Sequence, residues 1–335
     1  MRVLFIGGTG IISSACSHLA VERGMDLYLL NRGKTLRRQA PKGATLLQGD
    51  IRDITSVRAA LGLMSFDVVV NWIAFTPDHV EQDLALFRGR TGQYIFISSA
   101  SAYHKPVRSL PITESTPLHN PYWQYSRDKI ACEERLMRAY REEAFPITIV
   151  RPSHTYDRTL LPVHDRWTVV DRMRRGLPVV VHGDGTSLWV LTHHRDFAKG
   201  FIGLLGRSQA LGEAYHITSD EVLTWNQIFE TVAQVAGAPE PRLVHVPSEF
   251  IAAFDPRWGA GLLGDKAHSV IFDSAKIKRL VPDYVATIPF RQGAEEILDW
   301  FAADPARREV DPAWGAQMDA IIAAYQGAWP KKTDA

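Results

Sequence analysis

The chain has 335 residues, of which 46% are hydrophobic and 22% charged, a composition typical of a folded globular protein. Its 38 basic and 37 acidic side chains nearly cancel, which argues against a protein that coats a polyanion. The two cysteines, Cys16 and Cys132, are too few for a disulfide framework or a four-thiolate zinc site. The chain opens directly into a predicted strand and has no long apolar run, so we expect a cytoplasmic protein without membrane contact.

Short apolar runs alternate with longer amphipathic stretches up to residue 150. The runs are rich in β-branched residues, as in strands buried between two helical layers. They predict strands at 3–6, 27–30, 45–47, 68–70, 94–97 and 147–150. Apolar residues at helical spacing predict helices over 12–23, ended by Gly24, and over 125–141. Repeated strand–helix units imply an α/β fold with a Rossmann-type, doubly wound parallel sheet.

The pattern changes after residue 152, where Pro, Gly and His separate shorter elements. We therefore predict a dinucleotide-binding domain over 1–155 and a smaller mixed α/β substrate lobe over 156–330, parts of which return to the sheet. The polar tail at 330–335 is expected to be disordered.

Residues 7–13 read GGTGIIS, follow the first predicted strand and open the first helix. Gly7 can adopt a turn conformation closed to other residues, and Gly10 leaves room for a pyrophosphate at the helix N-terminus. Ser13 stands where a third glycine is often found and is small enough for close packing. The context favours dinucleotide binding over a purely structural turn. The expected contacts are Gly7, Thr9, Gly10, Ile11 and Ile12.

The end of the second strand bears on the choice of cofactor. An acidic residue that binds ribose is expected about 20 residues after the glycine turn, but the sequence there has Asn31 and Arg32. Asn31 can hydrogen-bond a 2′-hydroxyl, and Arg32 can pair with a 2′-phosphate or stack on adenine. We therefore favour NADP, with NAD as the alternative. Lys34, Arg37 and Arg38 fit a solvated loop.

Asp50 closes the third predicted strand. Its carboxylate can accept a hydrogen bond from the adenine amino group, and Ile51 can cover the adenine face. Asp53 is expected only to cap the next helix.

A group of hydroxyl residues follows the strand at 94–97, at the sheet edge where open α/β folds bind ligands. Tyr125 and Lys129 come later, spaced so that a helix sets both side chains on one face. An ammonium group beside a phenol lowers the phenol pKa from about 10. Such a tyrosine can exchange a proton with a substrate hydroxyl or carbonyl.

Together these motifs resemble the extended short-chain dehydrogenase/reductases, often called NAD-dependent epimerase/dehydratases. The resemblance covers nearly the whole chain, through GGTG at 7–10, GDIRD at 49–53, SSASAY at 98–103, RPSHTY at 151–156 and DSAK at 273–276. It implies a catalytic set of Ser99, Tyr125 and Lys129, with Lys129 also binding the nicotinamide ribose. It further implies cofactor contacts at Ile73, Ala74, Pro152 and Ser153.

Some positions depart from the family pattern, and these departures reduce the range of activities that we expect. Sugar 4,6-dehydratases have an acidic pair after the catalytic hydroxyl, whereas this chain has Ala100 and Ser101, so we do not expect a dehydratase. Trp189 stands where nucleotide-sugar enzymes usually have an arginine that binds a diphosphate. We therefore expect a sugar or polyol-like substrate that need not carry a nucleoside diphosphate. Its expected contacts are Ser101, Tyr103, His154 and Trp189.

Several alternatives remain open. An epimerase and a simple reductase or dehydrogenase need the same catalytic residues. A nucleotide-sugar epimerase with a rearranged diphosphate site could use Arg158 or Arg195 as the missing cation. A non-catalytic protein similar to chloroplast stem-loop RNA-binding proteins could use the arginines at 172, 174 and 175 on phosphate.

Two further expectations concern metal and assembly. His182, His193 and His194 lack a third ligand at matching spacing, so no metal site is predicted. The family resemblance suggests a homodimer that pairs through the helices at 80–88 and 125–141.

Overall fold

The computed structural model describes residues 1–33, 38–164 and 166–329. The predictions for Lys34, for Arg37 and for the tail at 330–335 fall outside these ranges. No helix within them is both long and apolar enough to cross a membrane.

Seven parallel strands form the central sheet in the order β11-β6-β5-β4-β1-β2-β3, which confirms the Rossmann-type prediction. Each of the predicted apolar runs lies in one of these strands. Their bounds are β1 (Arg2–Ile6), β2 (Asp26–Asn31), β3 (Thr45–Gln48), β4 (Phe66–Asn71), β5 (Thr91–Ile97), β6 (Ile147–Pro152) and β11 (Ala214–Ile217).

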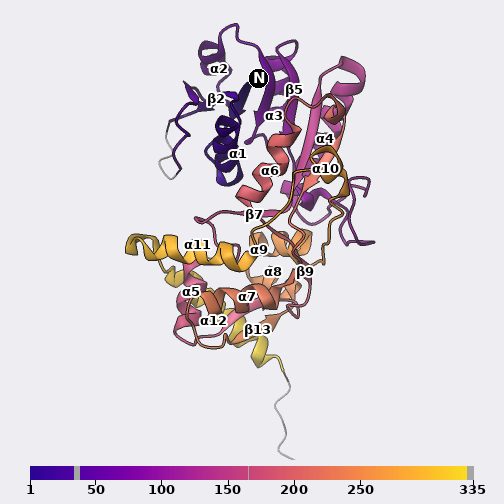
Figure 1. Cartoon of the computed structure of the whole chain (residues 1–335). Helices are drawn as coiled ribbons and strands as arrows, with labels where there is room; N and C mark the ends of the chain where they lie inside the picture. Colours follow the sequence, from indigo (N-terminus) through magenta and orange to yellow (C-terminus); the bar gives the residue numbers. More distant parts are fainter. Residues whose placement is uncertain (34–37, 165, 330–335) are drawn as a thin grey trace, which may run out of the picture.

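Helices cover both faces of this sheet (Figure 1). One face packs against α1 (Ile11–Glu22), α6 (His194–Leu204) and α10 (Ala275–Leu280). The other packs against α2 (Ile54–Leu61), α3 (Pro77–Phe87) and α4 (Gln124–Glu143). The strand order reverses between β1 and β4, so the carboxyl ends of these two strands flank the crevice where such sheets bind ligands.

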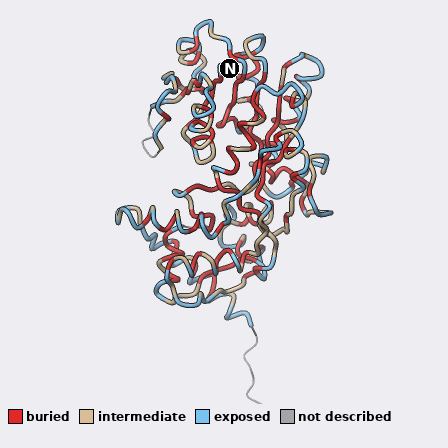
Figure 2. Tube along the Cα trace, viewed as in Figure 1, coloured by how far each residue is buried: buried red, intermediate tan, exposed pale blue. Residues whose placement is uncertain are grey.

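The remaining elements build a second hydrophobic core beside the carboxyl edge of the sheet, visible as the lower group of buried segments in Figure 2. Its strands are β7 (His154–Tyr156), β8 (Val179–His182), β9 (Leu188–Trp189), β10 (Leu191–His193), β12 (Leu223–Thr224) and β13 (Leu243–Val246). Its helices are α5 (Arg166–Arg174), α7 (Trp225–Val235), α8 (Ser248–Phe254), α9 (Pro256–Gly261), α11 (Phe290–Ala302) and α12 (Pro312–Gly327).

Short turns of other helical types complete the chain: η1 (Ala100–Ala102), η2 (Ser208–Ala210), η4 (Pro305–Arg307) and the π-helical turn η3 (Leu262–Lys266). β7 runs across the boundary expected at residue 155, and β11 completes the sheet from beyond it. The division into two domains at that residue stays a prediction.

Candidate active site

The glycine turn between β1 and α1 is shaped for close approach of a ligand to the backbone. Gly7 has φ +86°, in the left-handed region that favours glycine, and a Cβ on Gly8 would lie 2.5 Å from Leu29. Ser13 locks the turn because its Oγ donates to the Gly7 carbonyl oxygen at 2.9 Å and accepts from Gly10 N at 2.7 Å. The turn leads straight into α1, whose N-terminus attracts anions.

A cleft of about 820 Å³ opens in front of this turn, a size that suits a dinucleotide. It runs between the carboxyl ends of β1 and β2 and the start of α2. Ile12 lies apart from it, packed against the cluster beneath the sheet, and Ile11 is the first residue of α1. The predicted residues that line the cleft are Gly7, Thr9, Gly10, Asn31, Arg32, Asp50, Ile51 and Ile73.

Arg32 and Asp50 face each other in the lining of this cleft. The Arg32 guanidinium is 4.0 Å from the Asp50 carboxylate, and the two side chains are 61% and 41% exposed. Arg32 is therefore free to turn toward a ligand phosphate. Asp53 caps α2 as predicted, accepting from Thr55 N at 3.0 Å and Ser56 N at 3.3 Å.

Arg38 differs from the solvated residue that the sequence suggested. Its guanidinium nitrogen Nε donates to Asp157 at 2.6 Å, and both side chains are largely buried. A second nitrogen of Arg38 donates to Thr159. This ion pair joins the segment after β2 to the segment after β7.

The strand-end hydroxyls and the α4 pair meet at the carboxyl edge of β5. Ser99 caps the η1 turn, where its Oγ accepts from Ser101 N at 3.2 Å and lies 2.9 Å from Ser101 Oγ. Tyr125, in the first turn of α4, lies beside the Ser99 hydroxyl. The side chain of Lys129 is one helical turn further along, with its Nζ 5.7 Å from the Tyr125 ring centre.

The Lys129 ammonium group is buried and held by main-chain oxygens. Its Nζ donates to the carbonyl oxygens of Ala74 at 2.6 Å and Ile97 at 2.7 Å. Burial lowers the pKa of Lys129 to about 8. The side chain of Ala74 is fully buried, so the contribution of this residue is its carbonyl oxygen, which accepts the hydrogen bond from Lys129.

The expected lowering of the Tyr125 pKa is not what the structure gives. Burial raises the pKa of Tyr125, the Asp265 carboxylate adds to the increase, and hydrogen bonding to Ser99 opposes it. Burial is the main cause, and Lys129 Nζ donates to the Ala74 and Ile97 carbonyl oxygens rather than to the phenol.

A second cavity, of about 290 Å³, lies in front of Ser99 and Tyr125. It collects residues from β5, α4, the β6–β7 segment, β9 and η3, which are far apart in the sequence. The predicted site residues that line it are Ser99, Ser101, Tyr125, Pro152, Ser153, His154 and Trp189.

His154 and Trp189 form one hydrogen-bonded unit in the cavity wall. The Trp189 indole nitrogen donates to His154 Nδ1 at 3.0 Å, so the neutral ring carries its proton on Nε2. Burial, reinforced by the charge of Lys266, lowers the pKa of His154 to about 3. His154 is therefore a neutral hydrogen-bonding group at physiological pH.

Tyr103 does not belong to this site, and the prediction that it contacts substrate is wrong. Its side chain is fully buried, with its hydroxyl 3.1 Å from His216 Nδ1. The Arg151 guanidinium lies over its ring at 4.9 Å. The chain turns at η1, so this last residue of the hydroxyl-rich segment faces the core.

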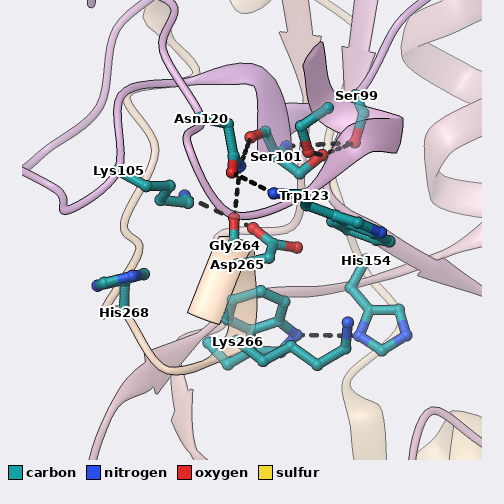
Figure 3. A network of polar contacts seen from close by, with 12 residues as sticks. Ser99, Ser101, Lys105, Asn120, Trp123, His154, Gly264, Asp265, Lys266 and His268 are labelled. Carbon is teal, nitrogen blue, oxygen red and sulfur yellow. Dashed lines mark hydrogen bonds and ion pairs between the residues drawn. The ribbon is translucent and has the colours of Figure 1, made fainter. Parts of the chain in front are cut away.

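Sequence reasoning missed Asp265 and Lys266, which line the same cavity from η3. Figure 3 shows Lys105 and Asn120 supporting this turn from behind. The buried Lys105 ammonium lies 3.5 Å from Asp265, and Asn120 donates to the Gly264 carbonyl oxygen at 2.7 Å. The only feature of the sequence that could have indicated these two residues is local. An acidic and a basic residue stand side by side after the apolar, glycine-rich run at 259–264.

The cations offered as substitutes for the diphosphate-binding arginine lie elsewhere. Arg158 and Arg195 line a separate cavity of about 770 Å³ between α1 and α6, and Arg195 is paired with Glu296. The arginines considered for phosphate contact are also engaged within the chain. Arg172 pairs with Asp319, and Arg174 donates to the Ala236 carbonyl oxygen at 3.0 Å.

Comparison with known proteins agrees with this geometry. The model of the NAD dependent epimerase/dehydratase family matches residues 3–218. The chain belongs to the NAD-dependent epimerase/dehydratase family. As a member of this family it has homologues that are epimerases, dehydratases and reductases.

Two curated relatives and one solved structure illustrate the range of similarity. A chloroplast stem-loop binding protein of 41 kDa from Arabidopsis thaliana is 28% identical over 262 residues, covering 74% of this chain and 67% of that protein. The 2'-dehydrokanamycin reductase of Streptomyces kanamyceticus is 28% identical over 300 residues, covering 85% and 80%. The dTDP-glucose 4,6-dehydratase of Bacillus anthracis in complex with NAD superposes with a TM-score of 0.71 at 19% identity, covering 91% and 98%.

Proposed function

We propose that this family member is an NAD(P)-dependent oxidoreductase or epimerase that acts on a carbinol or keto carbon of a sugar-like substrate. The observation that carries the proposal is one cavity that holds Ser99 and Tyr125 on one side and Pro152, Ser153 and His154 on the other. When bound, the dinucleotide supplies or accepts the hydride.

The fit of the dinucleotide rests on the glycine turn, the N-terminus of α1 and the cleft they open. In this proposal the turn binds the pyrophosphate, Asp50 and Ile51 hold the adenine, and Lys129 holds the nicotinamide ribose. Arg32 is exposed beside the ribose end and favours a 2′-phosphate, so NADP is the proposed cofactor and NAD the alternative.

Tyr125 is the proposed proton partner of the reacting oxygen, and the Ser99 hydroxyl orients that oxygen. A tyrosine phenol is protonated at neutral pH, so Tyr125 can donate the proton that the substrate oxygen gains when a keto group is reduced. An epimerisation would instead begin with oxidation of a carbinol at this carbon and end with reduction of the resulting ketone from its opposite face.

The position of Arg158 and Arg195 favours a substrate without a nucleoside diphosphate. Both lie in the cavity between α1 and α6, and neither lines the one that holds Tyr125. A diphosphate needs charge-assisted partners when it leaves water. A nucleotide-sugar epimerase with a rearranged site remains the alternative enzyme.

A second candidate is an RNA-binding protein, favoured by the likeness to the Arabidopsis stem-loop binding protein. Against it stands the internal pairing of Arg172 and Arg174. The assembled Ser99, Tyr125 and Lys129 set also has no use in binding RNA.

One experiment separates the candidates. NADPH and NADH fluorescence is titrated with the protein, and a stem-loop RNA is tested by gel shift at low and high salt. We expect enhanced NADPH fluorescence and no salt-dependent RNA shift. A salt-dependent shift without cofactor binding would reject the enzyme in favour of the RNA-binding protein.

A further inference from the structure

The π-helical turn η3 fixes Lys266 in the wall of the catalytic cavity. Three donors converge on the Lys266 carbonyl oxygen: His182 Nε2 at 3.0 Å, Trp225 Nε1 at 3.2 Å and Ser187 Oγ at 3.3 Å. π-helical turns occur frequently at functional sites. Here the main chain is held from one side, and the side chain projects toward the space in front of Tyr125.

Lys266 stands where two cavities meet. It lines the cavity that contains Tyr125 and also a neighbouring aromatic cavity of about 300 Å³, and the two share Trp123 and His154 as well. The Lys266 ammonium group lies 5.5 Å from the Trp123 ring centre. A substrate atom bound by this ammonium group would thus lie beyond the reacting carbon.

The Lys266 ammonium group has no anionic partner within residues 1–33, 38–164 and 166–329. The adjacent carboxylate, Asp265, pairs instead with Lys105 at 3.5 Å. A cation–π contact with one tryptophan offsets only part of the cost of removing an ammonium group from water. An ion of opposite charge would offset more.

Lys266 is the cation at the junction of the two cavities. Lys105 and Asp265 form an ion pair, and Arg257 lines the aromatic cavity as a second cation. Burial lowers the pKa of His154 to about 3 and of His164 and His182 to about 4, so these rings are neutral at physiological pH. Burial also lowers the pKa of Lys266, and a bound anion would oppose that shift.

We propose that the substrate carries an anionic oxygen group, a carboxylate or a phosphate, that pairs with the ammonium group of Lys266. This inference rests on the proposed function, since it names the substrate class of the same site. The reacting carbon lies at Ser99 and Tyr125, and the anionic group reaches the junction of the two cavities.

The test uses three probes that differ only at carbon 6: glucose, glucuronate and glucose 6-phosphate. Binding to the NADPH-loaded protein is followed by calorimetry and by tryptophan fluorescence, since Trp123, Trp189 and Trp225 surround the site. We expect at least one anionic probe to bind about 10- to 100-fold more tightly than glucose, the factor typical of a charge-assisted hydrogen bond. Glucuronate ahead of glucose 6-phosphate would identify the carboxylate.

Two variants of Lys266 and one of its neighbour complete the test. Lys266→Met should abolish the preference for the anion, and Lys266→Arg should keep it. Asp265→Asn adds one net positive charge and should strengthen glucuronate binding, which gives a gain rather than a loss to detect. Equal binding of the three probes, no binding of either anion, or a preference that persists in Lys266→Met overturns the inference.

The cofactor titration keeps the two proposals apart. If NADPH binds and no anion preference is found, the inference about Lys266 fails alone. If the anion preference is found by calorimetry on protein that does not bind NADPH, the proposed redox function fails and the anion site stands.

Discussion

The side-chain amide of Asn120 donates a 2.7 Å hydrogen bond to the carbonyl oxygen of Gly264, 144 positions later in the chain. The same amide donates to the Ser101 carbonyl oxygen at 2.9 Å. One buried side chain thus ties η1, the turn that follows β5, to η3, and so fixes the position of Ser101 relative to Asp265 and Lys266.

Replacing this residue should loosen both segments. Asn120→Ala leaves two buried carbonyl oxygens without this donor, at a cost of about 1–3 kcal/mol for each unsatisfied group. We expect the free energy of unfolding in urea to fall by at least about 2 kcal/mol. Gln292→Ala, on the exposed face of α11, is the control and should change it by less than about 0.5 kcal/mol.

Tyr125→Phe should lower kcat by about 100-fold or more, because general acid–base catalysis typically contributes that much. NADPH affinity, measured by fluorescence titration, should stay within about twofold, since the phenol acts on the substrate oxygen. Tyr122→Phe tests an exposed tyrosine just before α4 and should keep full activity. Equal turnover in the two variants would contradict the assignment of Tyr125.

Arg32→Ala should weaken NADPH binding by about 10- to 100-fold and NADH binding little, because only the former has a 2′-phosphate for the guanidinium. Arg58→Ala, an exposed arginine in the last turn of α2, is the matched control. Unmodified protein with equal affinity for the two cofactors would refute the NADP preference.

Buried histidines should make the protein sensitive to acid. Burial lowers the pKa of His154 to about 3 and of His182, His193 and His194 to about 4. The unfolded chain, with histidine pKa values of about 6.5, binds more protons below that pH, so this stability is present above pH 6.5 and lost toward pH 4. Each histidine contributes up to about 1.4 kcal/mol per pH unit.

The measurement is the free energy of unfolding in urea at pH 7.5, 6 and 5. His182→Phe keeps an aromatic ring against Trp225 and removes one buried titrating group, so its stability should fall less steeply with acid. His18→Gln removes an exposed histidine of α1 and should follow the unmodified protein. Parallel slopes for all three would contradict the assignment.

We also propose a homodimer that pairs through α3 and α4, which lie side by side and are joined by the ion pair of Glu81 with Arg135. Light scattering at micromolar concentration should give twice the chain mass. Arg135→Glu would place three acids together, with Glu81 and Glu143, and should shift the protein toward monomer. Arg207→Glu, outside this face, should not.

The features that the sequence predicted correctly depend on neighbours along the chain. The turn at Gly7 and Gly10 needs only its flanking strand and helix, and the cap at Asp53 needs only the next residues. Tyr125 and Lys129 share a face because α4 is continuous between them. Local patterns of this kind predicted the strands of the sheet and the glycine turn, whereas the grouping of Ser99 with Tyr125 was implied by the family resemblance.

The errors arose where distant residues decide. Tyr103 was assigned to the substrate because it follows the hydroxyl segment, but His216 holds it in the core. The sequence offered Arg172 as a possible contact for phosphate. In the structure its guanidinium pairs with Asp319 and donates to the Gly315 carbonyl oxygen. Sequence analysis did not select Lys266, because only the fold brings it into one cavity with His154 and Tyr125. Both of these residues lie more than a hundred positions earlier in the chain.

β11 joins the central sheet beside β6, although it lies far beyond residue 155 in the chain. This pairing makes the folding of the first 155 residues depend on later segments. A fragment that ends at residue 155 would lose β11 and α6, and the buried strand β6 would become a free sheet edge. Phe197 and Phe201 of α6, which pack against Phe5 and Trp72, would be missing from one face of the sheet. The hydrophobic core of the first 155 residues is therefore completed by segments that follow them in the chain, so we expect such a fragment to be less stable than the whole protein.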